Sequence, residues 1–306
     1  MPTRPIPAFV NLESGSGQQA RDALDAVGVF DVEACEPGSL DRQIQHAVER
    51  GADRVVVAGG DGTVAKAASV LVGQTTALAV VPGGTLNHFA KDYGIPTDHT
   101  RAAEVSANGE TRTADVATVN GKLFLNTSSV GAYVIFVRTR ERLERYLGYR
   151  LATIVAGFRL FGRVRPFTVH LELDGAPRQY RSALVFVGVG ERELQLPSIG
   201  SRAENGRRGL HVIVVRGGTA ARLVATGVMA AFGGARGVAR RALADSFVVD
   251  RCRIELRRRR GRVAINGEII EMDSPLEYAI SRDALRLVVP CDEDSGKMGA
   301  AETSMR

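Results

Sequence analysis

One stretch of the sequence decides the fold: Val55-Val56-Val57-Ala58-Gly59-Gly60-Asp61-Gly62-Thr63-Val64-Ala65-Lys66-Ala67-Ala68. Its β-branched residues predict a strand, its three glycines a tight turn, and the alanines and lysine that follow a helix. Glycines let the backbone approach an anion, and the free N–H groups of a first helical turn can donate hydrogen bonds to it. The junction therefore predicts phosphate binding.

Asp61 does not suit a simple phosphate cradle, because its carboxylate repels phosphate. Three roles remain open for this side chain. It could bind a cation, accept a proton from a substrate, or hold the loop by accepting hydrogen bonds from backbone N–H groups.

The N-terminal third alternates apolar strand-like runs with amphipathic helix-like runs. The predicted strands are 8–12, 30–35, 55–58 and 77–81, and the predicted helices are 18–27, 40–50 and about 97–107. This alternation predicts parallel βαβ units, whose ligands bind outside the carboxyl ends of the strands. The glycine-rich loops after the first, third and fourth strands should therefore gather on one rim.

The pattern changes to strands near residue 113, where Asn120-Gly121 predicts a hairpin turn between strands at 113–119 and 122–128, and Asp174-Gly175 predicts a later turn. Later predicted strands are 167–173, 180–189, 210–216, 247–257, 262–266, 269–272 and 285–289. We expect an α/β domain with a parallel sheet at 1–112. An antiparallel β-sandwich domain with helical insertions follows at 113–292, and a polar, disordered tail at 293–306.

Two helical insertions are predicted in the second domain, at 134–164 and 220–243. The first is rich in arginine and has an apolar face, so it is either a core-packed helix pair with solvated arginines or a membrane-surface element. The second is interpreted as packing.

The composition limits the binding partners and the cellular location expected of the protein. The 306 residues carry a formal charge of +6, which favours an anionic partner such as nucleotide, nucleic acid or acidic lipid. Nucleic acid is disfavoured, because the basic run Arg257–Arg260 has no interleaved aromatic residues. Three scattered cysteines, no apolar signal core and no long apolar run predict a cytoplasmic protein without a transmembrane helix.

The motifs resemble those of the diacylglycerol kinase catalytic superfamily, which includes bacterial lipid kinases and sphingosine kinases. The resemblance rests on Val57-Ala58-Gly59-Gly60-Asp61-Gly62-Thr63, on Pro82-Gly83-Gly84-Thr85-Leu86-Asn87-His88-Phe89-Ala90 and on Asn266-Gly267-Glu268. It extends from Asn11 to about Val289. Gly-Gly-Asp-Gly alone also occurs in NAD kinases and 6-phosphofructokinases, but the combination of motifs is more specific.

The resemblance implies that 1–112 is an α/β N-terminal nucleotide-binding domain and that 113–292 is a β-sandwich lipid-substrate domain. It also implies an active site in the cleft between them, where the γ-phosphate of ATP is transferred, with Mg²⁺, to a lipid hydroxyl. Glu268 would accept the hydroxyl proton, and Asp61 would organise magnesium and the phosphate loop. Without the resemblance, Glu268 is a solvated side chain at a hairpin turn. The implied nucleotide-binding residues are Asn11, Ser14, Gly15, Gly59, Gly60, Asp61, Gly62, Thr63, Gly84, Thr85 and Asn87.

Several positions depart from the family pattern. Carboxylates common in the family are replaced by His88, Tyr133 and Asn266, and Asn266 matters most because an amide neither takes up a proton nor neutralises Mg²⁺. Milder changes are Leu12 for proline and Cys35 for threonine. A second, structural magnesium site is not predicted, because residues 204–210 lack the aspartate pair.

Three functional hypotheses follow. The first is an ATP-dependent kinase of a diacylglycerol-like or sphingoid lipid, peripherally associated with an anionic membrane, which would serve phospholipid biosynthesis; a homodimer is compatible with it. The second, motivated by Asn266, is a member that binds nucleotide or lipid but has reduced or lost turnover. The third, a soluble kinase of the NAD type, is weaker because the Gly-Thr-x-Asn loop follows the lipid-kinase pattern.

Overall fold

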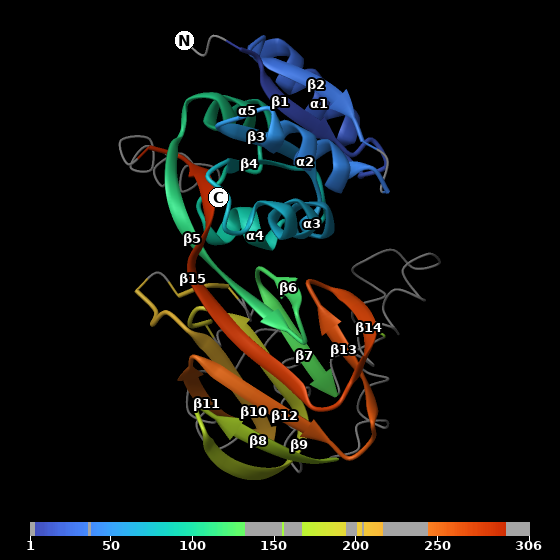
Figure 1. Ribbon diagram of the computed structural model, residues 1–306, viewed down its shortest axis with the longest axis vertical. Coiled ribbons are helices and arrows are strands. Elements are labelled where there is room, and N and C mark those ends of the chain that lie inside the picture. Colours follow the sequence, from blue (N-terminus) through green and yellow to red (C-terminus); the bar gives the residue numbers. More distant parts are fainter. Residues whose placement is uncertain are drawn as a thin grey trace. The chain divides into compact units, whose positions relative to one another are not determined.

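The chain forms two compact units in a computed structural model, which describes residues 4–35, 38–131, 155, 167–193, 201–203, 205–216 and 244–291 (Figure 1). Unit 1 comprises the chain up to Asp115 and the segment from Asp283 onward, and unit 2 comprises Val116–Arg282. Apart from residue 155, the insertions predicted at 134–164 and 220–243 lie outside the described residues. The tail predicted at 293–306 lies outside them too.

Unit 1 is built on a parallel sheet, as predicted. Its strands are β1 (Ile6–Val10), β2 (Phe30–Ala34), β3 (Arg54–Gly59) and β4 (Ala77–Pro82), in the order β4-β3-β1-β2. The end of β15 (Leu276–Val289) adds a parallel strand beside β4, where Leu287 pairs with Leu78. β3 and β4 are almost wholly buried because they consist of valine, alanine and leucine.

Five helices accompany this sheet in the described part of unit 1. They are α1 (Gly17–Val27), α2 (Leu40–Glu49), α3 (Asp61–Leu71), α4 (His88–Asp92) and α5 (His99–Asn108). α1 buries Ala20, Ala23 and Leu24 and ends at Gly28, whose φ of 74° is readily adopted by glycine. The short helix α4 was not predicted, because the sequence was interpreted there as a loop.

Unit 2 is antiparallel, also as predicted. Its strands are β6 (Lys122–Phe124), β7 (Thr127–Gly131), β8 (Phe167–Leu173), β9 (Ala176–Val189), β10 (Leu210–Arg216), β11 (Ala244–Val249), β12 (Arg251–Leu256), β13 (Arg260–Ile265) and β14 (Glu268–Asp273), with parts of β5 (Glu110–Val119) and β15. The main order is β14-β13-β7-β9-β8-β12-β15, while β10 joins β9 to β11. Phe124 and Tyr278 pack edge to face in its core.

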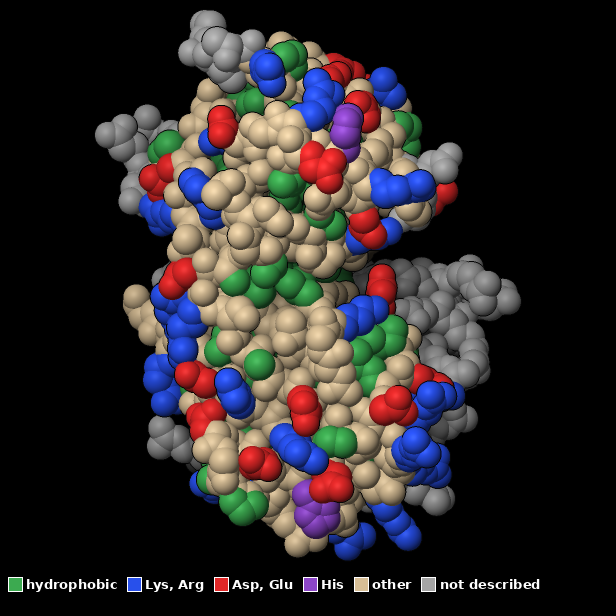
Figure 2. All heavy atoms as spheres, in the orientation of Figure 1, with side chains coloured by type: hydrophobic (Ala, Val, Ile, Leu, Met, Phe, Trp, Pro, Cys, Tyr) green, Lys and Arg blue, Asp and Glu red, His purple; other side chains and the backbone are tan. Residues whose placement is uncertain are grey.

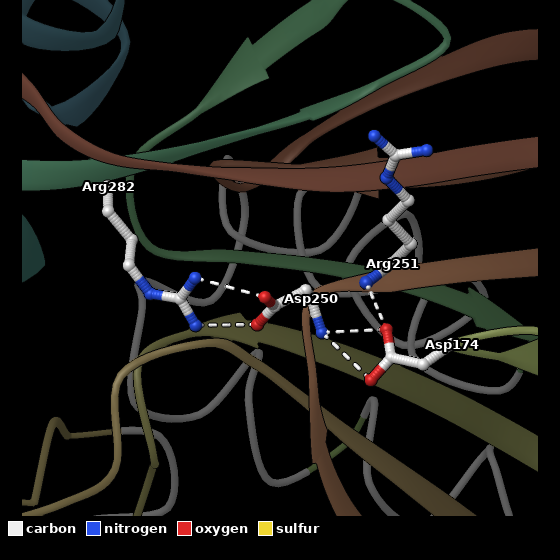
Figure 3. A network of polar contacts seen from close by, with 4 residues as sticks. All are labelled: Asp174, Asp250, Arg251 and Arg282. Atoms are coloured by element: carbon white, nitrogen blue, oxygen red, sulfur yellow. Dashed lines mark hydrogen bonds and ion pairs between the residues drawn. The ribbon is translucent and has the colours of Figure 1, made fainter.

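The predicted strand 247–257 is wrong, because Asp250 divides it into β11 and β12. Figure 3 shows the reason: the carboxylate of Asp174, in the β8–β9 turn, accepts hydrogen bonds from the backbone N–H groups of Asp250 and Arg251. The Asp250 carboxylate in turn pairs with the guanidinium of Arg282, which lowers the pKa of Asp250. Residues far apart in sequence therefore fix this bend.

Two other strand predictions also differ from the structure. The predicted strand 122–128 is divided into β6 and β7, and the strand predicted at 285–289 is only the end of the longer β15. The compact units likewise divide differently from the predicted domains: unit 2 begins at Val116, and the residues from Asp283 onward group with unit 1.

The chain leaves unit 1 within β5 and returns to it within β15. At this junction, the backbone N–H of Asp283 donates to Oδ1 of Asp115 at 3.0 Å, and Thr113 Oγ1 donates to Oδ1 of Asp283 at 2.7 Å. These contacts lie within unit 1. They place the last residue before unit 2 next to the first residue after it.

The charged surface of unit 2 mixes both signs. Figure 2 shows acidic and basic side chains interspersed on its visible face, and cross-strand ion pairs join Arg260 to Asp273 and Arg262 to Glu271. Within the described part of the chain, no helix is long and apolar enough to cross a bilayer.

Candidate functional site

The glycine-rich loops after β1, β3 and β4 gather in unit 1, as predicted. Asn11 Nδ2 donates to Thr63 Oγ1 at 3.2 Å, which joins the first loop to the second. The N–H of Gly83 donates to the carbonyl of Gly59 at 2.8 Å, which joins the third loop to the second. Ser16 Oγ donates to the carbonyl of Gly83 at 3.2 Å, which joins the first to the third.

Glycine is required where these loops touch. A Cβ atom on Gly84 would lie 2.7 Å from the Cα of Gly60, and one on Gly59 would lie 2.7 Å from the Cβ of Thr63. Both distances are below van der Waals contact. The glycines are therefore needed for the packing of the loops as well as for access to a ligand.

Asp61 holds the loops together. Its side chain lies at the start of α3, and its two carboxylate oxygens accept hydrogen bonds from the backbone N–H groups of His88 and Phe89, both at 3.1 Å. Asp61 thus caps α4, which begins at His88. Of the three roles left open by the sequence, the structure shows the loop-holding one.

Asn87 closes the loop before α4. It adopts a left-handed conformation with φ of 50°, its Oδ1 accepts from the N–H of Gly84 at 2.9 Å, and its Nδ2 donates to the carbonyl of Gly84 at 2.8 Å. Thr85, between the two, is exposed. In the first loop, Ser14 Oγ donates to the carbonyl of Asn11 at 2.6 Å, and the space beside Gly15 is open.

The remaining candidates line the start of α3. Gly60 is the N-cap, and Asp61, Gly62 and Thr63 form the first turn. The N–H groups of a first helical turn have no partner within the helix and carry partial positive charge. This end of unit 1 therefore offers several backbone donors to an anion.

Glu268 is the first residue of β14 in unit 2 and is exposed. It pairs with Ile265 across the two-residue turn Asn266-Gly267, whose φ values of 49° and 89° are both positive. Such turns favour Asn-Gly, because both residues tolerate the left-handed region.

Asn266 has a structural task in this turn. Its N–H donates to the carbonyl of Thr127 at 3.0 Å, and its Oδ1 accepts from the N–H of Leu125 at 3.2 Å. The amide therefore ties the β13–β14 turn to the chain between β6 and β7. Asn266 therefore has a structural role that does not depend on catalysis.

Each unit holds part of the predicted site. The nucleotide candidates lie together in unit 1, whereas Glu268 lies in unit 2. Tyr133 lies outside the described residues. Within those residues, no three histidine, cysteine or acidic side chains gather into a metal site.

Two buried polar residues in unit 2 were not predicted from the sequence. His211 is buried; its Nδ1 accepts the N–H of Arg192 at 2.8 Å, and burial lowers its pKa. Asn126 is only 4% exposed, and its Oδ1 has no hydrogen-bond partner. The signal for Asn126 was a single amide among the apolar residues Leu123, Phe124 and Leu125.

Unit 1 thus belongs to the class of α/β proteins in which loops at the carboxyl ends of parallel strands form a cradle of backbone donors. Residues 5–119 match the family model of the diacylglycerol kinase catalytic domain, so this part of the chain is similar to that family.

Individual proteins are also similar to this chain. The chain is 31% identical over 183 residues to a diacylglycerol kinase of Mycobacterium tuberculosis, covering 56% of this chain and 59% of the relative. It is 33% identical over 142 residues to a diacylglycerol kinase of Bacillus subtilis, covering 45% of this chain and 46% of the relative. The chain therefore spans about half the length of the curated relatives it matches.

The fold extends beyond the matched sequence. A crystal structure of a diacylglycerol kinase from Bacillus anthracis superimposes with a TM-score of 0.68 at 20% identity, covering 94% of this chain and 98% of that one. At that identity the likeness concerns the fold, which the two proteins share over both units.

Proposed function

We propose that this protein is an ATP-dependent lipid kinase that transfers the γ-phosphate to a hydroxyl of a diacylglycerol-like or sphingoid lipid. The observation that supports this best is the interlocking of the three glycine-rich loops by Asn11, Ser16 and Asp61. The interlocked loops hold backbone N–H donors in position for phosphate, within residues that match the model of the diacylglycerol kinase catalytic domain. Preset donors favour phosphoryl transfer, which depends on positioning and charge neutralisation.

The nucleotide would bind to unit 1. Its phosphates would accept from the first-turn N–H groups of α3, beside the loops that carry Ser14, Gly15, Thr85 and Asn87. Mg²⁺ bound to the nucleotide would neutralise phosphate charge; it usually takes its ligands from phosphates, water and one or two carboxylates. Asp61 fits as one such carboxylate, because each of its oxygens accepts one N–H and retains a lone pair.

Glu268 would serve as the proton acceptor. The lipid hydroxyl oxygen would form a bond to the γ-phosphorus, the bond from that phosphorus to the β,γ-bridging oxygen would break, and the hydroxyl proton would pass to Glu268. The products are a lipid phosphate and ADP. An exposed carboxylate at the first position of β14, held by a hydrogen-bonded turn, suits a general base.

The acceptor lipid implies a membrane setting. A long-chain alcohol stays in the bilayer, so the enzyme would associate with the membrane peripherally. The free arginines of the β12–β13 turn, Arg257, Arg258 and Arg259, are exposed, and among the described residues none forms an ion pair. They add positive charge that would favour an anionic surface.

The test is transfer of labelled phosphate from Mg-ATP into a total lipid extract, followed by assays with dioctanoylglycerol, sphingosine and NAD. Glu268→Gln should lower kcat by about 10²-fold or more, the usual size of a general-base effect. It should leave the thermal midpoint unchanged, because Glu268 is exposed. Glu271→Gln, an exposed change on the same strand, is the matched control and should retain activity.

Two results would contradict the proposal. Tight ATP binding without labelling of any lipid would favour a binding protein that has lost turnover. Phosphorylation of NAD but of no lipid would favour the soluble NAD-type kinase.

A further inference from the structure

Asn126 is a buried amide without a partner. The residue is only 4% exposed, and within the described part of the chain its Oδ1 has no hydrogen-bond partner. Leaving such a group unpaired is unfavourable, because the hydrogen bonds it makes to water in the unfolded chain are not replaced. Native proteins hold few such groups, so each one requires an explanation.

The backbone around Asn126 prevents the side chain from finding a partner by a small shift. Its own carbonyl accepts the N–H of Val189 at 2.9 Å. On either side, the N–H of Leu125 donates to Asn266 Oδ1 and the carbonyl of Thr127 accepts from the N–H of Asn266. Asn126 is therefore fixed against the turn that carries Glu268.

The strand register places Asn126 and Glu268 at the same end of the sheet. Ile265 of β13 pairs with Ser128 of β7 on one side and with Glu268 of β14 on the other. Ser128 and Glu268 therefore lie about two strand spacings apart, or about 10 Å between backbones. Asn126 lies two residues before Ser128, and the hydrogen bonds of Leu125 and Thr127 to Asn266 place it beside the turn that Glu268 follows.

The chemistry of Asn126 fits a neutral polar head. A primary amide offers both a donor and an acceptor without a charge. It can therefore hydrogen-bond a hydroxyl or an adjacent carbonyl, and its desolvation costs less than that of an ion. Its neighbours Phe124 and Leu125 are buried and apolar, as the environment of a lipid requires.

We infer that Asn126 is a positioning residue that hydrogen-bonds the polar head of the lipid acceptor and holds its hydroxyl beside Glu268. The inference rests on the proposed function and adds a group that determines acceptor binding. The unpaired amide is then a ligand contact that the free protein leaves unfilled.

The test is Asn126→Leu, which keeps the number and branching of the side-chain heavy atoms and removes the amide. KM for dioctanoylglycerol should rise about tenfold or more, the effect of losing one or two hydrogen bonds, while KM for ATP stays unchanged. The thermal midpoint should stay the same or rise, because an unpaired buried polar group is removed. If Asn126 were merely structural, the substitution would lower the thermal midpoint and leave KM for dioctanoylglycerol unchanged.

Ser129→Ala is the matched control. It removes another buried, unpaired oxygen from β7, but Ser129 pairs with Ala264 further along β13, away from the turn. Its KM for dioctanoylglycerol should equal that of the unmodified protein. A rise equal to that of Asn126→Leu would overturn the inference, because it would show a general effect on β7.

A binding measurement separates this inference from the proposed function. Dioctanoylglycerol without ATP should raise the thermal midpoint of the unmodified protein and not that of Asn126→Leu. If the lipid binds in this Asn126-dependent way but is never phosphorylated, the kinase proposal fails and the inference stands. A lowered midpoint in Asn126→Leu, or an unchanged KM and unchanged binding, would overturn the inference.

Discussion

The glycine-rich loops of unit 1 and the β13–β14 turn of unit 2 differ in how completely the polar groups around them are paired. In unit 1, Asn11 and Asp61 are hydrogen-bonded to neighbouring loops, and Asn87 is hydrogen-bonded within its own loop. In unit 2, Asn266 is paired with a neighbouring segment, but Oδ1 of Asn126 beside it has no partner within the described residues. In unit 1, hydrogen bonds within the protein therefore already hold the backbone donors in position. In unit 2, the Asn126 amide is left to hydrogen-bond a ligand.

The largest effect on stability and ATP affinity should come from a change in the closely packed glycine-rich loops of unit 1. Gly84→Ala places a Cβ 2.7 Å from the Cα of Gly60, and backbone cannot yield as a side chain can. We expect a loss of about 1–3 kcal/mol in unfolding free energy. ATP affinity, measured by calorimetry, should fall at least about tenfold, because misplaced loops lose their preset donors.

Gly38→Ala is the control for this change, since nothing lies within 4 Å of its added Cβ. If Gly84→Ala bound ATP as the unmodified protein does, the loops would not need their close packing.

A smaller effect should come from Asp61→Asn. An amide has one acceptor oxygen in place of two, so either the His88 or the Phe89 N–H would lose its partner. We expect a loss of about 1–2 kcal/mol in unfolding free energy, measured by urea denaturation. Asp31→Asn, an exposed change on β2, should cost nothing measurable.

The same variant separates the roles of Asp61. If Asp61→Asn lost activity with no change in unfolding free energy, its main role would be in binding Mg²⁺ or a proton rather than in holding α4.

The smallest effect should come from Asn266→Asp. Aspartate keeps an oxygen that can accept from Leu125, so the unfolding free energy should change by less than about 0.5 kcal/mol. Turnover should change by less than about threefold, the rate equivalent of a similar energy. A large gain in turnover would show instead that this position had lost a catalytic carboxylate.

The parallel sheet and its loops could be predicted because their signals are local. Buried strands such as β3 are runs of β-branched residues, and strand-helix alternation places their loops on one rim. The Asn120-Gly121 and Asp174-Gly175 turns were recognised for the same reason. In both, the two residues have positive φ values, which these residue types tolerate.

The rest could not be predicted because it depends on contacts between distant residues. The break at Asp250 is imposed by Asp174, and α4 begins where Asp61 caps it. The middle of β15 contains Arg282 and Asp283, whose charges interrupt the apolar pattern of the strand. The candidate site shows the same difference. Its glycine motifs could be recognised in the sequence, but whether Asn126 is paired depends on which groups surround it in the folded chain.

The contact between Asp115 and Asp283 has a genetic consequence. Unit 2 is one uninterrupted segment, and the residues on either side of it are hydrogen-bonded to each other. A gene joining codon 115 to codon 283 through a short linker would therefore encode unit 1 without spanning any gap. Unit 2 is thus an insertion between the adjacent strands β5 and β15 of unit 1. It could be exchanged for another domain without redesigning the ends of unit 1.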